Sequence, residues 1–284
     1  ILCTFPGKTG DLLWALPSLR AISEALEGEP IDLLIAGAYR GLVPLLERQP
    51  YLRHVEADPD WIVQDTAPMT PRIPAHRWWG LTPTVFHLGY RGWPTRPLPY
   101  ETYACLQAQW PPDWPSLPPL DLDRPWITAP APPLALPPAV TFGWTDEHFE
   151  LKVGLTALLL LKTGVGSDLL NVSWSPRWQV EWWEASLSRD VPATAAILGD
   201  WRKVAGLIAT TQVFCGDCSA LHVLACAVGT PVVVMEPNPH RHHEIFYPYG
   251  TEGRVRLVRG NDGLPSFDAR HTWDGIQAVL GETA

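Results

Sequence analysis

Short apolar runs and amphipathic segments alternate along the first part of the chain. Residues 1–5 and 31–35 are apolar runs of strand length, and residues 12–26 between them carry apolar side chains at helical spacing. A helix near residues 41–47 and a strand beginning at Val55 continue the series. The order strand, helix, strand, helix, strand predicts a parallel β-sheet with helices packed on its faces.

The same alternation starts again after residue 138. The pattern predicts strands at 139–143, 169–174, 193–198, 213–215, 232–234 and 255–258, and helices at 149–162, 178–188, 201–210, 220–228 and 272–280. Between the two series, residues 129–138 are rich in proline, which gives a stiff, extended spacer. We therefore predict an α/β protein of two Rossmann-like domains, 1–128 and 139–284, joined by the linker 129–138. The closing helix is also a candidate for packing back on the first domain.

The stretch from residue 66 to residue 100 breaks this pattern. It is dominated by Pro, Trp, Tyr, His and Arg, with one short apolar run at 85–88, and a helix follows at 101–110. A connection this long is usually functional or disordered, and its aromatic content argues against disorder. Two interpretations remain open, because the aromatic side chains either cover the sheet or face a ligand. The ligand-facing candidates are Trp78, Trp79, Tyr90 and Arg91.

Composition narrows the choice of partners and compartment. Over 284 residues the formal net charge is −9, which disfavours a partner held mainly through phosphate contacts. No apolar run is long enough to span a bilayer, since the run at 155–161 is too short. Five cysteines, an odd number without the spacing of a disulfide framework, favour a reducing compartment.

The turn at residues 216–219 carries the strongest chemical signal. It follows the predicted strand 213–215 and precedes the short helix 220–228, so it lies at the carboxyl end of a strand, where ligands of open α/β sheets bind. The free N–H groups and the positive end of the helix dipole would form a site for an anion such as a phosphate. Three residues of the turn are able to cap that helix: Asp217, Cys218 and Ser219.

The cysteines and the histidine of this region allow other interpretations. Cys215 and Cys218 form a Cys-x-x-Cys at a helix start, typical of a redox pair, and with His222 and Cys226 they would be candidate zinc ligands. Two observations argue against the redox and zinc interpretations. Cys215 ends a predicted buried strand, and no second pair of metal ligands lies nearby in the sequence. His222 is either a structural residue or a hydrogen-bond donor to a bound phosphate.

The segment 240–244, His-Arg-His-His-Glu, also suggests a metal site. It closely follows the predicted strand 232–234, at the edge of the sheet where substrates bind. The alternative to a metal site is a loop that faces a bound ligand, with Arg241 and His243 as its polar contacts.

The first predicted turn, Gly7-Lys8-Thr9-Gly10-Asp11, contains the tripeptide Gly-Lys-Thr found in P-loops. A P-loop needs a glycine five residues before Gly7, and that position is Leu2, so we exclude an ATPase. Asp11 is either the N-cap of the helix that follows or a catalytic group, and the two roles are compatible.

Two stretches of the chain resemble the signatures of one known family, glycosyltransferase family 9, the heptosyltransferase-like enzymes. In the first half Gly10-Asp11 is followed by Leu16-Pro17-Ser18-Leu19-Arg20, and in the second half the run from Gly216 to His222 precedes Gly229-Thr230-Pro231. The second stretch departs from the family pattern at two positions, with Cys218 where Ser or Thr is usual and Ser219 where Gly is usual. Each half of the chain thus carries one match.

The resemblance implies a GT-B fold, in which two Rossmann-like domains face each other across the active-site cleft. It implies an inverting transfer of a sugar from a nucleotide diphosphate-sugar to a glycan or lipopolysaccharide-type acceptor, without a metal or other cofactor. Asp11 would be the general base. The donor would be held by Thr9, Gly10, Asp217, Cys218, Ser219, Ala220 and His222, together with one basic residue, Lys152 or its rival Arg177.

The family has a loop ending in Pro-Tyr-Gly after the strand that follows Gly-Thr-Pro, and Pro248-Tyr249-Gly250 matches that ending. The resemblance therefore favours a loop at 240–244 that faces the donor or the acceptor, through Arg241 and His243, over a metal site.

The family also implies a cytoplasmic enzyme, with a peripheral place at the inner membrane face as an option. Three alternatives stay open. One is a phage-type glycosyltransferase acting on hydroxymethylated bases in DNA, which needs a basic groove and has only Arg72, Arg77, Arg91 and Arg96 to form one. The others are a non-catalytic module that binds a nucleotide-sugar or a glycan, which would lack a working base, and a Cys-x-x-Cys oxidoreductase.

Overall fold

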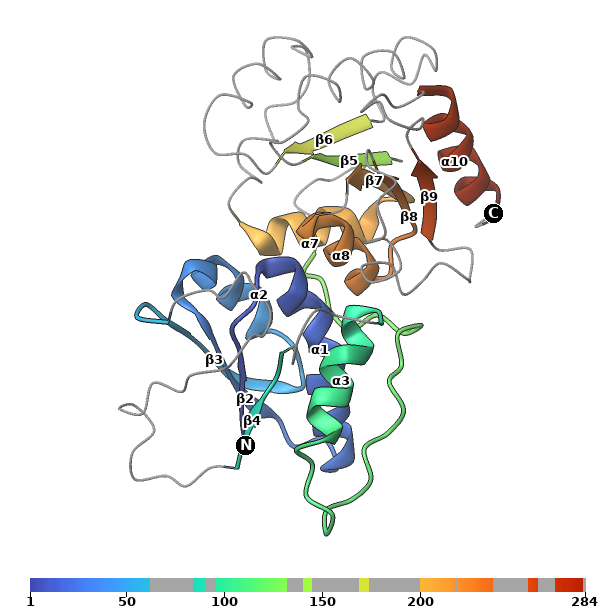
Figure 1. Cartoon of the computed structure of the whole chain (residues 1–284). Helices are drawn as coiled ribbons and strands as arrows, with labels where there is room; N and C mark the ends of the chain where they lie inside the picture. Colours follow the sequence, from blue (N-terminus) through green and yellow to red (C-terminus); the bar gives the residue numbers. More distant parts are fainter. Residues whose placement is uncertain are drawn as a thin grey trace. The chain divides into compact units, whose positions relative to one another are not determined.

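The computed structural model describes nine segments of the chain: residues 1–61, 84–89, 96–131, 140–144, 169–173, 200–217, 219–236, 255–259 and 269–282. These segments belong to two compact units. The first is built on Ile1–Thr128, and the second begins at Ala129. Each unit contains its own β-sheet (Figure 1).

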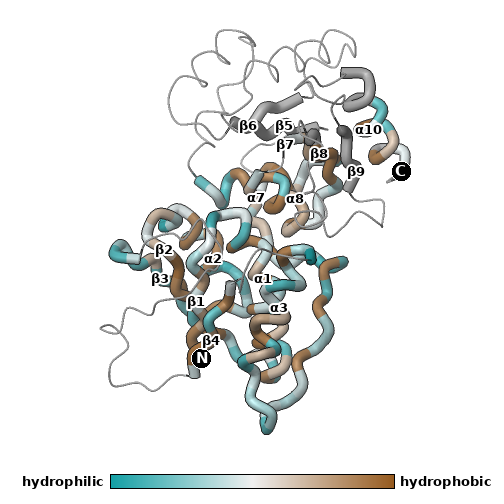
Figure 2. The backbone as a smooth tube through the Cα atoms, viewed as in Figure 1, coloured by the Kyte–Doolittle hydropathy of each residue, from teal (hydrophilic) through white to brown (hydrophobic). Residues whose placement is uncertain are grey.

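The first unit contains a four-stranded sheet in the order β3-β2-β1-β4. Its strands are β1 (Leu2–Phe5), β2 (Ile31–Ala36), β3 (Leu52–Asp58) and β4 (Val85–His87). All three neighbouring pairs are parallel, as the alternating pattern predicts. Every residue of β1 and β2 is buried, and Figure 2 shows the apolar stretch of β2 in brown.

The helix α1 (Thr9–Ala25) is the centre of this unit. Although its spacing suggests one apolar face, every residue from Leu12 to Ser23 is buried. One neighbour is α3 (Leu98–Gln107), which lies beside α1 in Figure 1. The helix predicted at 41–47 is a 3₁₀ segment, η1 (Gly37–Leu42), that runs into the single turn α2 (Val43–Leu46).

A segment without regular structure completes the burial of α1. The guanidinium of Arg20 is only 7% exposed, and it donates hydrogen bonds to the carbonyls of Asp121, Arg124 and Pro125, the last at 3.0 Å. The indole of Trp126 packs on that of Trp14 with a centroid distance of 5.6 Å and donates to the carbonyl of Leu13. A buried arginine is tolerated here because its N–H groups are satisfied by backbone carbonyls.

Where the chain passes from the first unit to the second, the residues on either side of Ala129 are held by contacts within their own units. The side chain of Gln49 accepts from the Thr128 N–H at 2.7 Å and also donates to the Thr128 carbonyl. Beyond Ala129, the carbonyl oxygens of Pro130 and Ala131 lie so close to Gly206 that a Cβ there would come within 2.9 and 2.8 Å of them. The predicted linker therefore begins with only Ala129 between the two anchors, while residues 132–138 lie outside the described residues.

The second unit contains a five-stranded sheet in the order β6-β5-β7-β8-β9, again parallel throughout. Its strands are β5 (Val140–Trp144), β6 (Leu169–Ser173), β7 (Val213–Asp217), β8 (Val232–Glu236) and β9 (Val255–Arg259). The described helices are α7 (Trp201–Thr210), α8 (Ala220–Val228) and α10 (Ala269–Glu282). The helices predicted at 149–162 and 178–188 and the strand predicted at 193–198 lie outside the described residues.

The closing helix α10 packs on the sheet of its own unit. It contacts β7, β8 and β9, and its apolar residues Ile276 and Val279 are fully buried. These two residues contribute to the core of the second unit.

The surroundings of Gly206 in α7 and Gly281 in α10 predict opposite effects of a glycine-to-alanine substitution on stability. Gly206→Ala would force a methyl group against two backbone carbonyls, so we expect the free energy of unfolding to fall by about 1–3 kcal/mol. Gly281→Ala in α10 meets no atom within 4 Å and removes a helix-weakening glycine, so a gain of up to about 1 kcal/mol is expected. Urea unfolding of the two variants measures both changes, and equal stabilities would show that the linker does not pack on α7.

Candidate functional site

The turn between β1 and α1 brings Asp11 back against the end of β1. A Cβ on Gly7 would lie 2.5 Å from Cε1 of Phe5, whose ring is fully buried, and 3.2 Å from Cβ of Asp11. Only glycine fits at this position, because the buried ring cannot move aside. The absence of a side chain at Gly7 is what allows the tight turn.

The structure corrects one of the two roles considered for Asp11. The N-cap residue of α1 is Lys8, with extended backbone angles, and Asp11 is the third residue of the helix. Its carboxylate therefore lies in the first helical turn, where the positive end of the dipole stabilises a negative charge. Thr9 and Gly10 are the first two residues of the same turn, and all three are partly exposed.

The strand order identifies where a ligand would bind in the first unit. The chain runs outward from β1 through β2 to β3 and then returns to β4 on the other side of β1. In open α/β sheets, ligands bind at the carboxyl ends of the strands where the order reverses in this way. Here that position lies between the ends of β1 and β4, next to the start of α1, which carries Asp11, and the last residue of β4 is His87.

The second unit has the same feature. The order reverses between β5 and β7, and α8 starts directly after β7, which ends at Asp217. The amino terminus of α8 therefore lies at the carboxyl edge of the sheet beside the reversal. This is the position that the sequence predicts for an anion site.

A capping box built on a histidine begins α8. Ser219 is the N-cap, and its hydroxyl accepts from the Leu221 N–H at 3.3 Å. In return, Nδ1 of His222 accepts from the Ser219 N–H at 2.9 Å. Glu or Gln usually has this part in a capping box. Because Nδ1 is the acceptor, a neutral His222 ring carries its proton on Nε2.

This geometry gives Ser219 and His222 a structural role at the start of α8. The imidazole of His222 is 2% exposed and holds the turn in place, as a structural residue would. The Ser219 N–H, expected to face a phosphate, is already donated to His222. The Ala220 N–H, at the first helical position, has no intrahelical acceptor and is a described donor at the amino terminus of α8.

The Gly229-Thr230-Pro231 tripeptide has a structural explanation. Gly229 ends α8 with a φ of 87°, a left-handed conformation that glycine adopts without strain. The Thr230 hydroxyl then donates to the Ile208 carbonyl of α7 at 2.7 Å, and the Pro231 carbonyl accepts from Phe214 of β7. The motif therefore fixes α8 to its neighbours, and with it the orientation of its amino terminus.

The thiols of this region are poorly suited to redox chemistry. Cys215 is fully buried and free, and burial raises the pKa of its thiol. Burial likewise raises the pKa of Cys226 to about 12. A redox pair needs a reactive thiolate, so the oxidoreductase interpretation is disfavoured. Within the described segments, no three His, Cys, Asp or Glu residues come together as a set of metal ligands.

Several predicted site residues lie outside the described segments: Trp78, Trp79, Tyr90, Arg91, Lys152, Arg177, Cys218, Arg241 and His243. Of the four arginines considered for a DNA groove, only Arg96 is described. It forms an ion pair with Glu101 at 3.5 Å, and its backbone N–H donates to the same carboxylate. This arginine is thus partly neutralised by its own unit.

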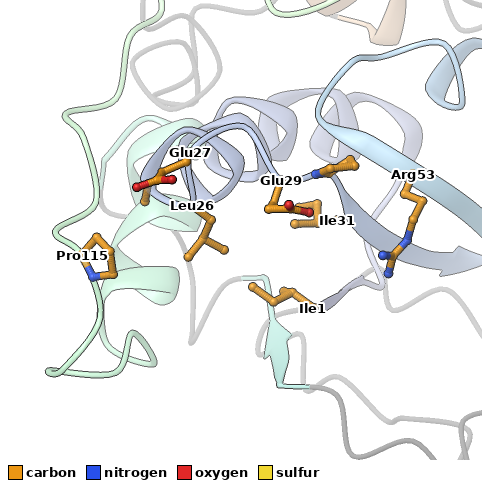
Figure 3. Close-up of a pocket in the computed structure, with 9 residues that line it drawn as sticks. Ile1, Leu26, Glu27, Glu29, Ile31, Arg53 and Pro115 are labelled. Atoms are coloured by element: carbon orange, nitrogen blue, oxygen red, sulfur yellow. The ribbon is translucent and has the colours of Figure 1, made fainter.

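A shallow pocket in the first unit lies at the wrong edge for this site. It has a volume of about 430 Å³ and is lined by residues such as Ile1, Leu26, Glu29 and Ile31 (Figure 3). These residues surround the amino ends of β1 and β2, whereas Asp11 and His87 lie at the carboxyl ends. The pocket's Arg53 is already held by two hydrogen bonds to Asp32, at 2.9 and 2.6 Å.

Of the comparisons with known proteins, only that with solved structures gives matches. No protein-family model matches the chain, and no curated protein does. Among solved structures, a glycosyl transferase family 9 protein from Veillonella parvula covers 99% of this chain and 97% of its own, with a TM-score of 0.67 and 13% identity. E. coli heptosyltransferase WaaC with ADP covers 98% and 99%, at a TM-score of 0.65 and 13% identity. E. coli ADP-heptose lps heptosyltransferase II covers 100% and 99%, at 0.57 and 15%.

Structural neighbours over nearly the whole chain are therefore family 9 glycosyltransferases and heptosyltransferases. At this level of identity the likeness shows that the chain has their fold. In the described part of the chain, no helix is both long and apolar enough to cross a membrane.

The capping box predicts a specific pattern of stability for His222 variants. His222→Ala removes the acceptor of the Ser219 N–H, and we expect a loss of about 1–2 kcal/mol in the free energy of unfolding. His222→Gln places an amide oxygen at the same helical position and should recover most of that loss. Urea unfolding distinguishes the two variants. If alanine and glutamine destabilise equally, the hydrogen bond to Ser219 is not what His222 contributes.

Proposed function

We propose that this chain is a glycosyltransferase that moves a sugar from a nucleotide diphosphate-sugar to a hydroxyl of a lipopolysaccharide-type glycan. The proposal rests on a feature that both units share, the reversal of strand order in a parallel sheet. Each has a parallel sheet whose strand order reverses, and at each reversal lies one of the two groups that sugar transfer needs. The fold shared with heptosyltransferases over 98–100% of the chain supports it.

The second unit would bind the donor. When the sugar leaves, negative charge grows on the diphosphate, and preorganised dipoles stabilise that charge best. The amino terminus of α8 offers the Ala220 N–H and the positive end of the helix dipole. Two of the similar solved structures hold ADP or ADP-2-deoxy-2-fluoro heptose, so ADP-heptose is the first donor to test.

The first unit would supply the base. The acceptor hydroxyl must lose a proton as it attacks, and a positioned carboxylate is able to take it. Asp11 is the carboxylate at the reversal of the first sheet, and it lies in the first turn of α1, at the positive end of the helix dipole. In the proposed GT-B arrangement the two units face each other across a cleft. Attack from the side of the base then displaces the diphosphate from the opposite side and inverts the anomeric carbon.

The base assignment predicts a loss of turnover without a loss of donor binding. Asp11→Asn keeps the shape of the side chain and removes its basicity, so we expect transfer from ADP-heptose to heptose-free lipopolysaccharide to fall by at least about 100-fold. ADP binding, followed by its stabilisation of the protein against heat, should be unchanged.

Asp113→Asn, at an exposed position of the same unit, is the matched control and should keep full activity. Near-normal turnover of Asp11→Asn would overturn the assignment of the base. Absence of both ADP binding and transfer in the unsubstituted protein would overturn the proposed function.

Donor activation by a helix terminus predicts metal-independent transfer. The N–H groups and the dipole of α8 are held in fixed positions and would stabilise negative charge on the diphosphate, so we expect no requirement for a divalent cation. We expect the rate to be unchanged in excess EDTA and after addition of Mg²⁺. A rate that EDTA abolishes and Mg²⁺ restores would contradict this mechanism.

A further inference from the structure

A proline interrupts the hydrogen bonds of α1. Pro17 lies inside this helix and has no N–H, so the carbonyl of Leu13, four residues earlier, lacks its usual intrahelical donor. Leu13 is completely buried, and a buried carbonyl without a donor destabilises the fold. Pro17 thus separates the first two turns of α1, which carry Asp11, from the remainder, which Arg20 ties to the carbonyl of Pro125.

The indole of Trp126 supplies the missing donor. Its Nε1–H donates to the Leu13 carbonyl at 3.0 Å, in a buried hydrogen bond between residues 113 positions apart. Its ring also packs on that of Trp14, the residue next to Leu13, with the two ring planes tilted by 34°. Trp126 is only 2% exposed, so this bond is shielded from water. The first two turns of α1 are therefore held by a side chain from a distant part of the chain.

The backbone around Trp126 is held in turn. The hydroxyl of the buried Tyr51 donates to the Trp126 carbonyl at 2.6 Å. Two residues further on, the side chain of Gln49 accepts from the Thr128 N–H at 2.7 Å. Tyr51 and Gln49 come directly before β3, so these bonds fix the indole relative to the sheet of the first unit.

We propose that Trp126 is a positioning residue for Asp11, and that it acts through the hydrogen bond that Pro17 leaves open at Leu13. This inference rests on the proposed function, because it explains how the general base is held in place. Helices bend at proline, where the series of backbone hydrogen bonds is interrupted. Loss of the bond from Trp126 would let the turns that carry Asp11 tilt, and a shift of about 1 Å is able to lower a rate by about 100-fold.

Removal of the indole N–H tests this role. Trp126→Phe keeps an aromatic ring against Trp14 and lacks the donor. We expect kcat for transfer from ADP-heptose to heptose-free lipopolysaccharide to fall by at least about 10-fold. The KM for ADP-heptose should stay within about 2-fold, because the donor is assigned to the second unit and Trp126 belongs to the first.

A compensating substitution tests the hydrogen bond itself. Pro17→Ala gives the helix its own N–H opposite the Leu13 carbonyl, so the donor from Trp126 is no longer needed. The double variant Pro17→Ala/Trp126→Phe should therefore recover kcat to within about 3-fold of the unsubstituted protein. A purely structural contribution of the indole ring would not be recovered, because alanine at position 17 does not replace the ring.

Tyr103→Phe is the matched control. It also removes one hydrogen bond to this irregular segment, from the Tyr103 hydroxyl to the Pro118 carbonyl, and this bond does not involve α1. We expect a lower melting temperature without a loss of kcat.

Three outcomes would overturn the role of Trp126: an unchanged kcat in Trp126→Phe, a loss that Pro17→Ala does not recover, or an equal loss in Tyr103→Phe. In each case the loss of turnover in Asp11→Asn would still stand, so the proposed function would survive. An unsubstituted protein that neither binds ADP nor transfers a sugar would refute the proposed function and this inference together.

Discussion

The account depends on one geometric constraint, the parallel direction of all strands within each sheet. Parallel strands end at the same edge, so the turns that follow them gather there, and the reversal of strand order opens a crevice between two of them. In the first unit this brings the turn after β1 next to His87. In the second it brings the start of α8 next to the end of β5. The chemistry proposed for the chain is a consequence of these two placements.

Packing makes both placements rigid. Gly7 lets the first turn pass over the buried ring of Phe5, and the Gly229-Thr230-Pro231 tripeptide ties α8 to α7 and β7. The clamp of Arg20 on the carbonyls of 121–125 keeps the chain fixed to the first unit until Thr128. Because the next anchor starts at Pro130, any hinge at this step is confined to a very short stretch of chain.

Within the described segments, the sequence predicts the strands and the main turns well, because apolar runs and glycine-rich turns are local signals. Contacts between distant residues are not predictable in this way. The side of α1 that faces away from the sheet is also buried. It is covered by Trp126 and by the carbonyl groups near Pro125 to which Arg20 donates, more than 100 positions along the chain. The start of α1 also differs from a simple capping pattern, because Lys8 rather than Asp11 has the N-cap geometry.

At the candidate site, the resemblance to family motifs locates the turns before α1 and α8, but it does not predict which contacts each residue of those turns makes. Asp217 to His222 is one sequence signature, yet within it His222 accepts a backbone hydrogen bond and thereby occupies the Ser219 N–H. This hydrogen bond depends on the three-dimensional geometry of the turn, which a linear pattern does not contain.

The most direct test of the central claim is a crystal structure of the protein with ADP bound. The account predicts that a β-phosphate oxygen lies about 3 Å from the Ala220 N–H, at the amino terminus of α8. It also predicts that the Asp11 carboxylate faces the crevice that holds the phosphate. ADP bound at the amino ends of the strands, or a phosphate that makes no contact with the start of α8, would contradict it.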